Sequence, residues 1–294
     1  YPDLEVVVVD NGSSDNSVPA IRERFKDALL IENKANLGFC GGYNIGIKYA
    51  LSQKPDYLLI LNNDAVADPA LVKELKAVVD SDSFIGAVSP IITFCDNQER
   101  IYFSGTKIDW GNGDFCAQYP RQFIGSAKGL LDIDFPGWCA TFMKTKVMEK
   151  VGLLDEPFFA YYDDADWGRR CKARGLRTVL YPKKLVAHKV SRSTGGSFSP
   201  SVYFYLFRNR LFFMRKHAHF LRKLQFSFCY VRDSYKHYDS LLRDNQQERA
   251  QAVMDAFWSA LNNCQLDKRL LMPEEFKSSR NIFTLIFLWG LTLK

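Results

Sequence analysis

The chain has 294 residues, and its 47% apolar and 24% charged residues are values typical of globular proteins with a sizeable core. Its seven cysteines are widely spread without a Cys-x-x-Cys pair, which argues against a zinc site or a disulfide framework and favours a reducing compartment. The net charge of +6 is concentrated in residues 203–238, so the remainder of the chain is nearly neutral.

Strand and helix patterns alternate from the N-terminus. Residues 4–9 form an apolar, β-branched run typical of a strand buried on both faces. A turn-forming cluster leads to a helical pattern, a second strand, a glycine-rich helix start, a third strand and a third helix, at residues 18–25, 29–32, 38–51, 57–61 and 69–79. This order predicts an α/β fold with a mostly parallel sheet flanked by helices, in which ligands bind beyond the carboxyl ends of the strands.

Polar clusters follow two of these strands. Asp10 can accept a hydrogen bond from a ribose or a base, and Asp64, preceded by two asparagines, can hold a divalent cation against a diphosphate. An ordinary turn and an ordinary helix cap remain the alternatives. The glycines of residues 38–46 would let backbone amides approach a phosphate or ribose, although the segment matches neither the Walker nor the Rossmann spacing.

Residues 161–167 place three carboxylates within four positions beside aromatic side chains. Like charges so close together repel, and burying one without a partner is costly. A metal, a substrate hydroxyl or a nearby cation would make use of such charge, and a carboxylate of raised pKa is a natural general base. The alternative is a helix N-terminus, where acidic side chains are stabilised by the macrodipole.

Residues 203–238 combine eight lysines and arginines with one acidic residue, Asp233, and with twelve aromatic residues. Such a basic and aromatic stretch would suit an anionic membrane surface, and it would also suit nucleic acid. The alternative is a set of helices whose aromatic residues form a core and whose charges are solvated.

Taken together, these motifs resemble the inverting family 2 glycosyltransferases of the GT-A fold, and within them the rhamnosyltransferase-like branch. The resemblance covers roughly residues 3–217, and its ordered set of features is far more specific than any one of them. The matching segments are Asp10-Asn11-Gly12-Ser13-Ser14-Asp15, Asn36-Leu37-Gly38-Phe39, Gly42-Tyr43-Asn44-Ile45-Gly46, Leu61-Asn62-Asn63-Asp64, Pro136-Gly137-Trp138-Cys139-Ala140, the stretch 151–166 that ends in Asp163-Asp164-Ala165-Asp166, and His188-Lys189-Val190-Ser191-Arg192-Ser193.

The resemblance implies a Rossmann-like nucleotide-binding half and assigns roles to individual residues. Asp164 would be the base that removes the proton of the acceptor hydroxyl, with Asp163 in place of the family's usual Glu. Asp64 would bind a divalent metal, Mn²⁺ or Mg²⁺, and His188 would lie near the metal or the diphosphate, unless it is a structural histidine. The donor nucleotide would be bound by Asp10, Asn11, Asn36, Gly38, Asn44 and Asn63. The acceptor and sugar pocket would contain Gly137, Trp138, Asp166 and Trp167, where the family often has Leu in place of Trp167.

We therefore predict an enzyme, a hexosyl- or rhamnosyltransferase of cell wall or polysaccharide biosynthesis. It would move a sugar from a UDP- or dTDP-linked donor to a hydroxyl of a glycan or lipid-linked acceptor, by metal-assisted single displacement with inversion. Only the branch resemblance suggests dTDP-rhamnose, because uracil and thymine offer the same hydrogen-bonding edge to Asp10. The alternative is a catalytically inactive nucleotide-sugar binding module, which would not need Asp164. Nucleic acid is not an expected partner, since the clustered carboxylates would repel phosphate.

Residues 1–217 are predicted to form the GT-A domain, and residues 218–294 a helical, basic and aromatic C-terminal extension. The family's first strand would precede residue 1, so we expect the domain to lack it. Residues 203–238 and 282–293 would suit peripheral contact with the inner face of the cell membrane from the cytoplasm, since the apolar run 282–293 is shorter than the ~18 residues of a membrane span. The competing interpretation is that these helices cover the sheet or mediate homodimer formation.

Overall fold

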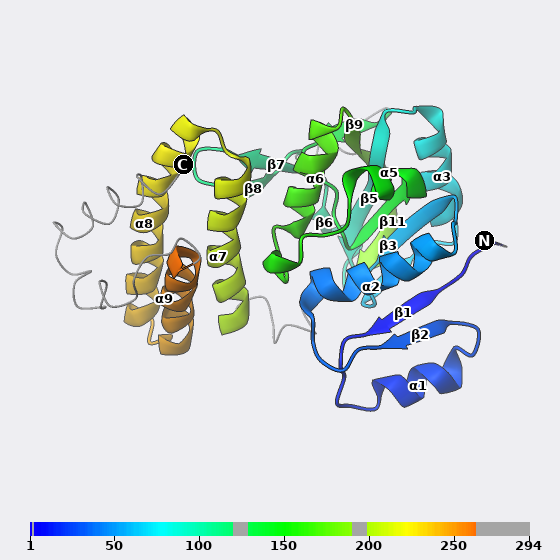
Figure 1. The fold of residues 1–294 in the computed structure, drawn as a ribbon, viewed down its shortest axis with the longest axis horizontal. Helices are drawn as coiled ribbons and strands as arrows, with labels where there is room; N and C mark the ends of the chain where they lie inside the picture. The colour runs from blue at the N-terminus through cyan, green and yellow to red at the C-terminus, as the bar shows by residue number, and fades with distance from the viewer. Residues whose placement is uncertain (2, 120–128, 190–198, 263–294) are drawn as a thin grey trace. The chain divides into compact units, whose positions relative to one another are not determined.

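The computed structural model describes residue 1 and residues 3–119, 129–189 and 199–262. Two compact units make up the chain (Figure 1). The first consists of Tyr1–Lys107 and Cys116–Val190, and the second of Ile108–Phe115 and Ser191–Lys294.

Strands and helices both occur throughout the part of the chain up to residue 188. They are β1 (Val7–Asp10), α1 (Ser17–Arg24), β2 (Leu29–Glu32), α2 (Gly38–Ser52), β3 (Tyr57–Leu61), β4 (Ala65–Ala67), α3 (Leu71–Ser81), β5 (Ile85–Phe94), β6 (Ile101–Phe103), β7 (Thr106–Asp109), β8 (Asp114–Ala117), β9 (Leu131–Ile133), β10 (Ala140–Lys144), α5 (Thr145–Val151), the 3₁₀-helix η1 (Glu156–Phe158), α6 (Asp163–Ala173) and β11 (Arg177–His188).

A seven-stranded sheet forms the centre of the first unit. Its strands follow the order β3-β10-β5-β11-β4, with β6 paired to β5 and β9 paired to β11. β10 is antiparallel to both β3 and β5, and β11 is parallel to β5, so β3, β5 and β11 run in one direction. The α/β class with helices around a central sheet is as predicted. The sheet is mixed rather than mostly parallel, because the antiparallel strand β10 lies between β3 and β5.

Helix α3 shows how the apolar pattern builds the core. Leu71, Leu75, Val78 and Val79 recur at helical spacing, and all four are buried against the sheet. Burying a side chain such as Leu75 stabilises the fold by roughly 1.5–3 kcal/mol. The opposite face of the same helix carries charged residues, so the sequence pattern alone fixes which side meets the sheet.

The N-terminal strands form a separate, parallel pair. Val7 of β1 lies opposite Leu29 of β2, and the register continues to Asp10 opposite Glu32. The prediction that residues 4–9 are buried on both faces is wrong, because Leu4 and Val6 are exposed and the valines of β1 are only half-buried. Within the described residues β1 pairs along one edge only, with β2. Asp10 stands at the carboxyl end of β1, where the α/β pattern predicted a ligand-binding edge.

In its described residues the second unit contains a bundle of three helices, α7 (Pro200–His217), α8 (Phe220–Arg243) and α9 (Gln247–Asn262) (Figure 1). Its apolar core includes Phe207 of α7, Leu241 of α8 and Val253 of α9. By its contacts this unit takes in α7, so the helical part begins before residue 218. Among the described residues, no helix combines the length and apolar character that crossing a membrane requires. The predicted membrane-contacting run 282–293 lies outside the described residues.

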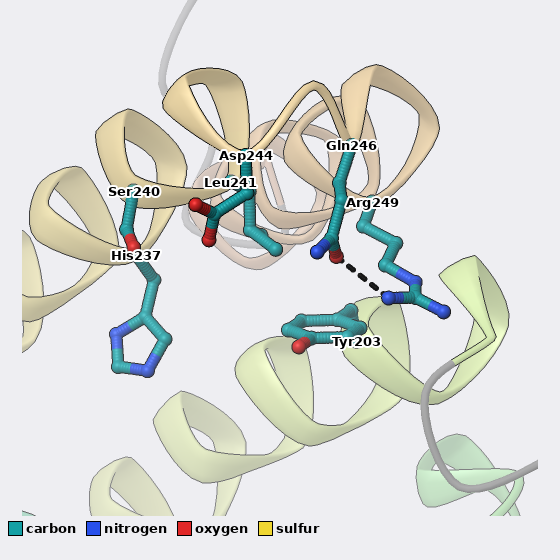
Figure 2. A pocket seen from close by; sticks show the side chains of 7 residues that line it. All are labelled: Tyr203, His237, Ser240, Leu241, Asp244, Gln246 and Arg249. Atoms are coloured by element: carbon teal, nitrogen blue, oxygen red, sulfur yellow. Dashed lines mark hydrogen bonds between the residues drawn. The ribbon is translucent and has the colours of Figure 1, made fainter.

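A groove of about 370 Å³ opens between the helices of this bundle (Figure 2). It is lined by Tyr203, His237, Ser240, Leu241, Asp244, Gln246 and Arg249. The guanidinium of Arg249 donates a hydrogen bond to the Gln246 side-chain oxygen at 2.6 Å. None of the predicted site residues lines the groove, and all of them belong to the first unit.

Candidate active site

The acidic segment forms the first turn of helix α6 and follows a strained loop. Phe159, Tyr161 and Tyr162 have φ angles of 63°, 66° and 67°, in the left-handed region. For residues with a side chain this conformation costs about 1–2 kcal/mol each, and such strain is concentrated at functional sites. The loop is fixed from outside, since the backbone N–H of Cys40 in α2 donates to the Phe159 carbonyl at 3.0 Å. The position of the acidic turn is therefore strongly determined.

Two neighbouring carboxyl groups in this turn differ in their surroundings. Asp163 is 3% exposed, and its Oδ2 atom is buried without a hydrogen-bond partner in the described structure. Asp164 is half-buried, and its Oδ1 atom accepts a hydrogen bond from the backbone N–H of Ala165 at 2.8 Å. Burial, followed by the charge of Asp164, raises the pKa of Asp163 well above its ordinary value. Burial also raises the pKa of Asp164, to about 7, although backbone hydrogen bonds lower it.

Asp166 and Trp167 lie on the inner side of α6. The Asp166 side chain is 0% exposed, and its Oδ2 atom accepts a hydrogen bond from Arg170 Nε at 2.8 Å. Arg170 also donates to the carbonyl oxygens of Val151 and Leu153 at 2.9 and 2.8 Å. Trp167 is equally buried. These contacts join α6 to the segment after α5, and they place both predicted acceptor residues in the interior.

The other two predicted acceptor residues are also enclosed. Trp138 is buried, and its ring packs edge-on against Trp167 with a centroid distance of 5.3 Å. The backbone N–H of Gly137 donates to Ser89 Oγ at 3.1 Å. A Cβ atom at Gly137 would lie 3.2 Å from the Phe103 ring, so the close packing there favours glycine. Segment 137–138 thus supports α6 from within the unit.

Asp64 and His188 come together from two distant parts of the sequence. Asp64 follows β3, and His188 is the last residue of β11, opposite Ala65 in the β4–β11 pairing. The Nε2 atom of His188 lies 2.8 Å from Asp64 Oδ1. The backbone N–H of Lys189 donates to the Asp64 carbonyl at 2.9 Å, and the Tyr102 ring meets the His188 imidazole edge-on at 4.7 Å. The two residues predicted as a metal pair are therefore in direct contact.

Two tyrosines link this pair to the acidic turn. Tyr102 of β6 is 44% exposed, and partial loss of solvent, with neighbouring charges that include Asp164 and Asp64, raises its pKa to about 12. Burial, followed by charges that include Asp64 and Asp163, raises the pKa of Tyr43 in α2. A charged side chain shifts the pKa of another group only when the two groups are close together. Asp64 and the first two carboxyl groups of α6, Asp163 and Asp164, therefore lie near the same two tyrosines.

The predicted donor loop is held by its own polar side chains. Asp10 Oδ2 accepts hydrogen bonds from the backbone N–H groups of Gly12 and Ser13 at 3.1 and 3.0 Å. Asn11 Nδ2 donates to Asn36 Oδ1 at 3.2 Å and to the Gly38 carbonyl at 2.8 Å. Asp10, Asn11, Asn36 and Gly38 are thus brought together at the carboxyl end of β1.

Asn44 and Gly38 connect α2 to the segment that precedes α6. Asn44 is 1% exposed, and its amide both donates to the Leu154 carbonyl at 2.9 Å and accepts from the Leu154 N–H at 3.0 Å. Its Nδ2 atom also donates to Glu156 Oε1 at 3.0 Å. Gly38 has a φ of 73°, and a Cβ atom there would lie 2.5 Å from the Phe159 ring. Both residues therefore hold the loop of the acidic turn against α2.

The Asp64–His188 pair fits a divalent cation. Neighbouring ligands of an octahedral cation with bonds of about 2.1 Å are roughly 3 Å apart, close to the 2.8 Å observed between Asp64 Oδ1 and His188 Nε2. His188 Nδ1 is buried without a hydrogen-bond partner in the described structure, so it can carry the proton when Nε2 binds a cation. No group of three or more His, Cys, Asp or Glu side chains suited to a metal occurs in the described part of the chain. The described residues would therefore supply two ligands, Asp64 and His188, and Asn63 is exposed in the adjacent turn.

Three residues that shape the site were missed from the sequence. Tyr102 lies on β6, whose place beside β5 depends on a long-range pairing that no local pattern reveals. Phe159 packs on Gly38 through an equally non-local contact. Arg170 could have been found, because it follows Asp166 by four residues, the spacing of an ion pair on one helix face.

Residues 1–152 match the family model of Glycosyl transferase family 2. The match covers more than half of the 294 residues, and the chain belongs to this family. Membership agrees with the resemblance drawn from the ordered motifs. It also classes the protein as a family 2 glycosyltransferase.

Several curated proteins are similar to this chain. The low-salt glycan biosynthesis hexosyltransferase Agl10 of Haloferax volcanii is 27% identical over 58% of this chain and 54% of its own length. The N-acetylglucosaminyl-diphospho-decaprenol L-rhamnosyltransferase of Mycobacterium tuberculosis is 23% identical over 65% of this chain and 68% of its own length. The dTDP-rhamnosyl transferase RfbF of Shigella flexneri is 24% identical over 63% of this chain and 60% of its own length. The matches thus span about half to two thirds of these relatives.

A solved structure supports the fold. The crystal structure of GalNAc-T7 with UDP, GalNAc and Mn²⁺ is 16% identical and has a TM-score of 0.54. The likeness covers 69% of this chain and 41% of that chain. At this identity it shows a common fold, and the predicted GT-A type architecture is confirmed.

Substituting Asp166→Ala is expected to lower the free energy of unfolding by about 3–5 kcal/mol, because Arg170 loses its buried partner. The matched control is Asp96→Ala, which removes an exposed ion pair of the same spacing with Arg100 and should change the free energy by less than about 1 kcal/mol. Urea unfolding followed by circular dichroism measures both. Equal effects of the two substitutions would contradict a structural role for Asp166.

Proposed function

We propose that this chain transfers a sugar from a nucleoside diphosphate donor to a hydroxyl of a glycan or lipid-linked acceptor, with inversion at the anomeric carbon. The observation that carries the proposal is the direct contact of Asp64 with His188, whose imidazole packs against Tyr102, a residue whose pKa Asp164 of the acidic turn also raises. One side can bind the leaving diphosphate through a cation, and the other offers a carboxylate to the incoming hydroxyl. Single displacement requires both at once.

Asp164 is the proposed general base. It is partly exposed, and its pKa of about 7 matches a base that works near neutral pH. Its carboxylate accepts the proton of the acceptor hydroxyl as the oxygen forms a bond to the anomeric carbon. The bond from that carbon to the diphosphate oxygen breaks, and its electron pair leaves with the diphosphate.

Asp163 takes a different role in this proposal. Two adjacent carboxyl groups in a buried setting do not both ionise easily. Asp163 is the more deeply buried of the two, so we infer that it retains its proton while Asp164 ionises. A neutral Asp163 avoids a second negative charge beside the base and leaves Asp164 free to accept a proton.

Asp64 and His188 are the proposed ligands of Mn²⁺ or Mg²⁺. When bound, such a cation neutralises part of the negative charge that the diphosphate gains as it leaves. The protein supplies one carboxylate and one imidazole in contact, and the ring of Tyr102 limits how His188 can turn. The crystal structure of GalNAc-T7 with Mn²⁺ supports a metal at this fold.

The nucleoside is proposed to bind at the loop that contains Asp10, Asn11 and Asn36. Asp10 Oδ2 is occupied by the loop's own N–H groups, so the Oδ1 atom is the one available to a pyrimidine N–H or a ribose hydroxyl. Uracil and thymine present the same edge to it. Two rhamnosyltransferases among the similar proteins support dTDP-rhamnose as the first donor to test, with UDP-sugars as the second.

The acceptor is proposed to approach over the exposed face of Tyr102, beside Asp164. Asp166 and Trp167 then act as internal supports of α6 rather than as acceptor contacts, because their side chains are buried. A lipid-linked acceptor is supported by the name of the mycobacterial relative, which acts on a decaprenol-linked sugar. Such an acceptor would place the enzyme at the cytoplasmic face of a membrane.

Thermal unfolding of the chain is expected to show stabilisation by one pyrimidine nucleoside diphosphate in the presence of Mn²⁺. Ligand at about a hundred times its dissociation constant should add roughly 2.7 kcal/mol, which shifts the melting temperature by several degrees. UDP, dTDP, GDP and ADP are compared with and without Mn²⁺. A shift for none of them, or an equal shift for all four, would contradict the proposed donor site.

Asp164→Asn is expected to abolish sugar transfer and to leave nucleotide affinity within about twofold, because Asn has the same shape but cannot accept the proton. Asp64→Ala should instead weaken Mn²⁺-dependent nucleotide binding by roughly tenfold or more. Radiolabelled sugar transfer and calorimetry measure the two effects. Full turnover by Asp164→Asn would remove that residue from the role of base, and nucleotide binding without any transfer by the unmodified chain would favour an inactive binding module.

The rate constant kcat/KM is expected to rise with pH and to level off above about 7, because Asp164 must be ionised to accept a proton and burial raises its pKa to about 7. Below that value the rate should fall roughly tenfold for each pH unit. Nucleotide affinity measured over the same range serves as the control, since it does not depend on the base. A flat rate profile between about pH 5 and 8 would exclude a base with this pKa.

A further inference from the structure

Helix α8 carries an apolar stripe on its outer face. Leu221, Phe228, Tyr235 and Leu242 recur at intervals of seven residues, and their exposed fractions are 69%, 51%, 38% and 42%. Residues seven apart lie nearly above one another on a helix, with a drift of about 20°. The four side chains therefore form one continuous stripe, about 30 Å long at a rise of 1.5 Å per residue.

The core of the bundle does not need this stripe. The opposite face of α8 is buried through Phe226 and Tyr230, and Leu241 joins the apolar core with α9. The Tyr230 hydroxyl donates to the Phe207 carbonyl at 3.0 Å, which satisfies its polar group inside the bundle. A helix that has already buried one apolar face normally turns charged residues to the outside. The exposed stripe thus calls for a second partner.

Basic side chains run beside the stripe. Arg232, Lys236 and Arg243 project within about 100° of it on the same outer face, at 3.6 residues per turn. The whole helix has five lysines and arginines against two acidic residues. Asp239 lies on the same outer face and pairs with Arg243, and Asp233 pairs with Arg210 and Arg232, so Arg232, Lys236, Arg243 and Asp239 leave two positive charges on that face. The outer face therefore combines exposed apolar area with net positive charge.

We propose that the outer face of α8 binds an anionic phospholipid surface. An amphipathic face with large apolar side chains and adjacent lysines and arginines suits the interface of a membrane that contains acidic lipids. A second copy of this helix fits less well, because two such faces would bring like charges together. The link between this contact and catalysis rests on the proposed function, since a lipid-linked acceptor lies at a membrane surface. Binding of α8 to the lipid does not itself require sugar transfer.

Vesicle flotation tests the inference. The full chain is mixed with vesicles of phosphatidylcholine alone or with about 30% phosphatidylglycerol, whose anionic headgroups supply the charge. The chain should float with the anionic vesicles and remain behind with the zwitterionic ones, and added salt should weaken its binding. The double variant Leu221→Ser/Phe228→Ser should bind at least about tenfold less, because it removes the two most exposed side chains of the stripe.

Matched variants separate this surface from general effects. Phe84→Ser removes a side chain that is 63% exposed in the first unit, and it should bind vesicles like the unmodified chain. Lys236→Glu should reduce binding about fivefold or more, whereas Lys146→Glu on α5 should not. Unfolding curves of every variant verify that the bundle remains folded. Nucleotide binding measured on the same samples should be unchanged.

Three results would overturn the inference. In the first, the unmodified chain does not float with anionic vesicles. In the second, the Leu221→Ser/Phe228→Ser variant floats as well as the unmodified chain. In the third, the Lys236→Glu and Lys146→Glu variants lose flotation to the same extent. A dimer in analytical ultracentrifugation that the stripe variant converts to monomer, without vesicle binding, would assign the face to a second copy. If the unmodified chain floats with anionic vesicles but binds no nucleotide, the result would count against the proposed transferase site and leave the membrane contact supported.

Discussion

The double hydrogen bond between the Asn44 amide and the backbone of Leu154 is the constraint on which the site depends. It joins α2, which follows the donor loop, to the segment that leads into the acidic turn. Both partners are buried, so neither group can exchange its hydrogen bond for water without a cost of about 1–3 kcal/mol. The Phe159 ring over Gly38 makes a second link between the same segments. The loop proposed to bind the nucleotide and the turn that carries the proposed base are therefore held to each other through α2.

The four carboxyl groups of the site differ in their partners and in their burial, and these differences limit how many of them are negatively charged at once. Asp166 is neutralised by Arg170, and Asp64 is hydrogen-bonded to His188. The buried Oδ2 atom of Asp163 has no hydrogen-bond partner in the described structure, and burial raises the pKa of Asp163, so this carboxyl group remains protonated more readily. That leaves Asp164 as the carboxyl group that can ionise near neutral pH and still reach solvent. Of these four carboxyl groups, Asp164 is therefore the one suited to the proposed role of base.

Local sequence patterns predicted the elements well and the long-range arrangement less well. Strands β2 and β3 lie at the predicted residues, and α2 begins at the predicted residue and ends one residue beyond the predicted segment 38–51. Those elements depend on periodic apolar residues close in sequence. The place of β10 between β3 and β5 depends on long-range pairings, such as Phe142 with Leu59 and with Val88, which composition and periodicity do not encode. The contact of Tyr102 with His188 is likewise set by such pairings.

The helical period of α6 explains why one acidic run serves both structure and chemistry. Asp163, Asp166, Trp167 and Arg170 recur at intervals of three and four residues and face the interior. Asp164 is offset by one residue from Asp163, about 100° around the helix, and so reaches solvent. The two interpretations of the run, a helix N-terminus and a base, are therefore compatible. The inner acidic residues anchor the turn, and that anchoring fixes the direction in which Asp164 presents its carboxylate.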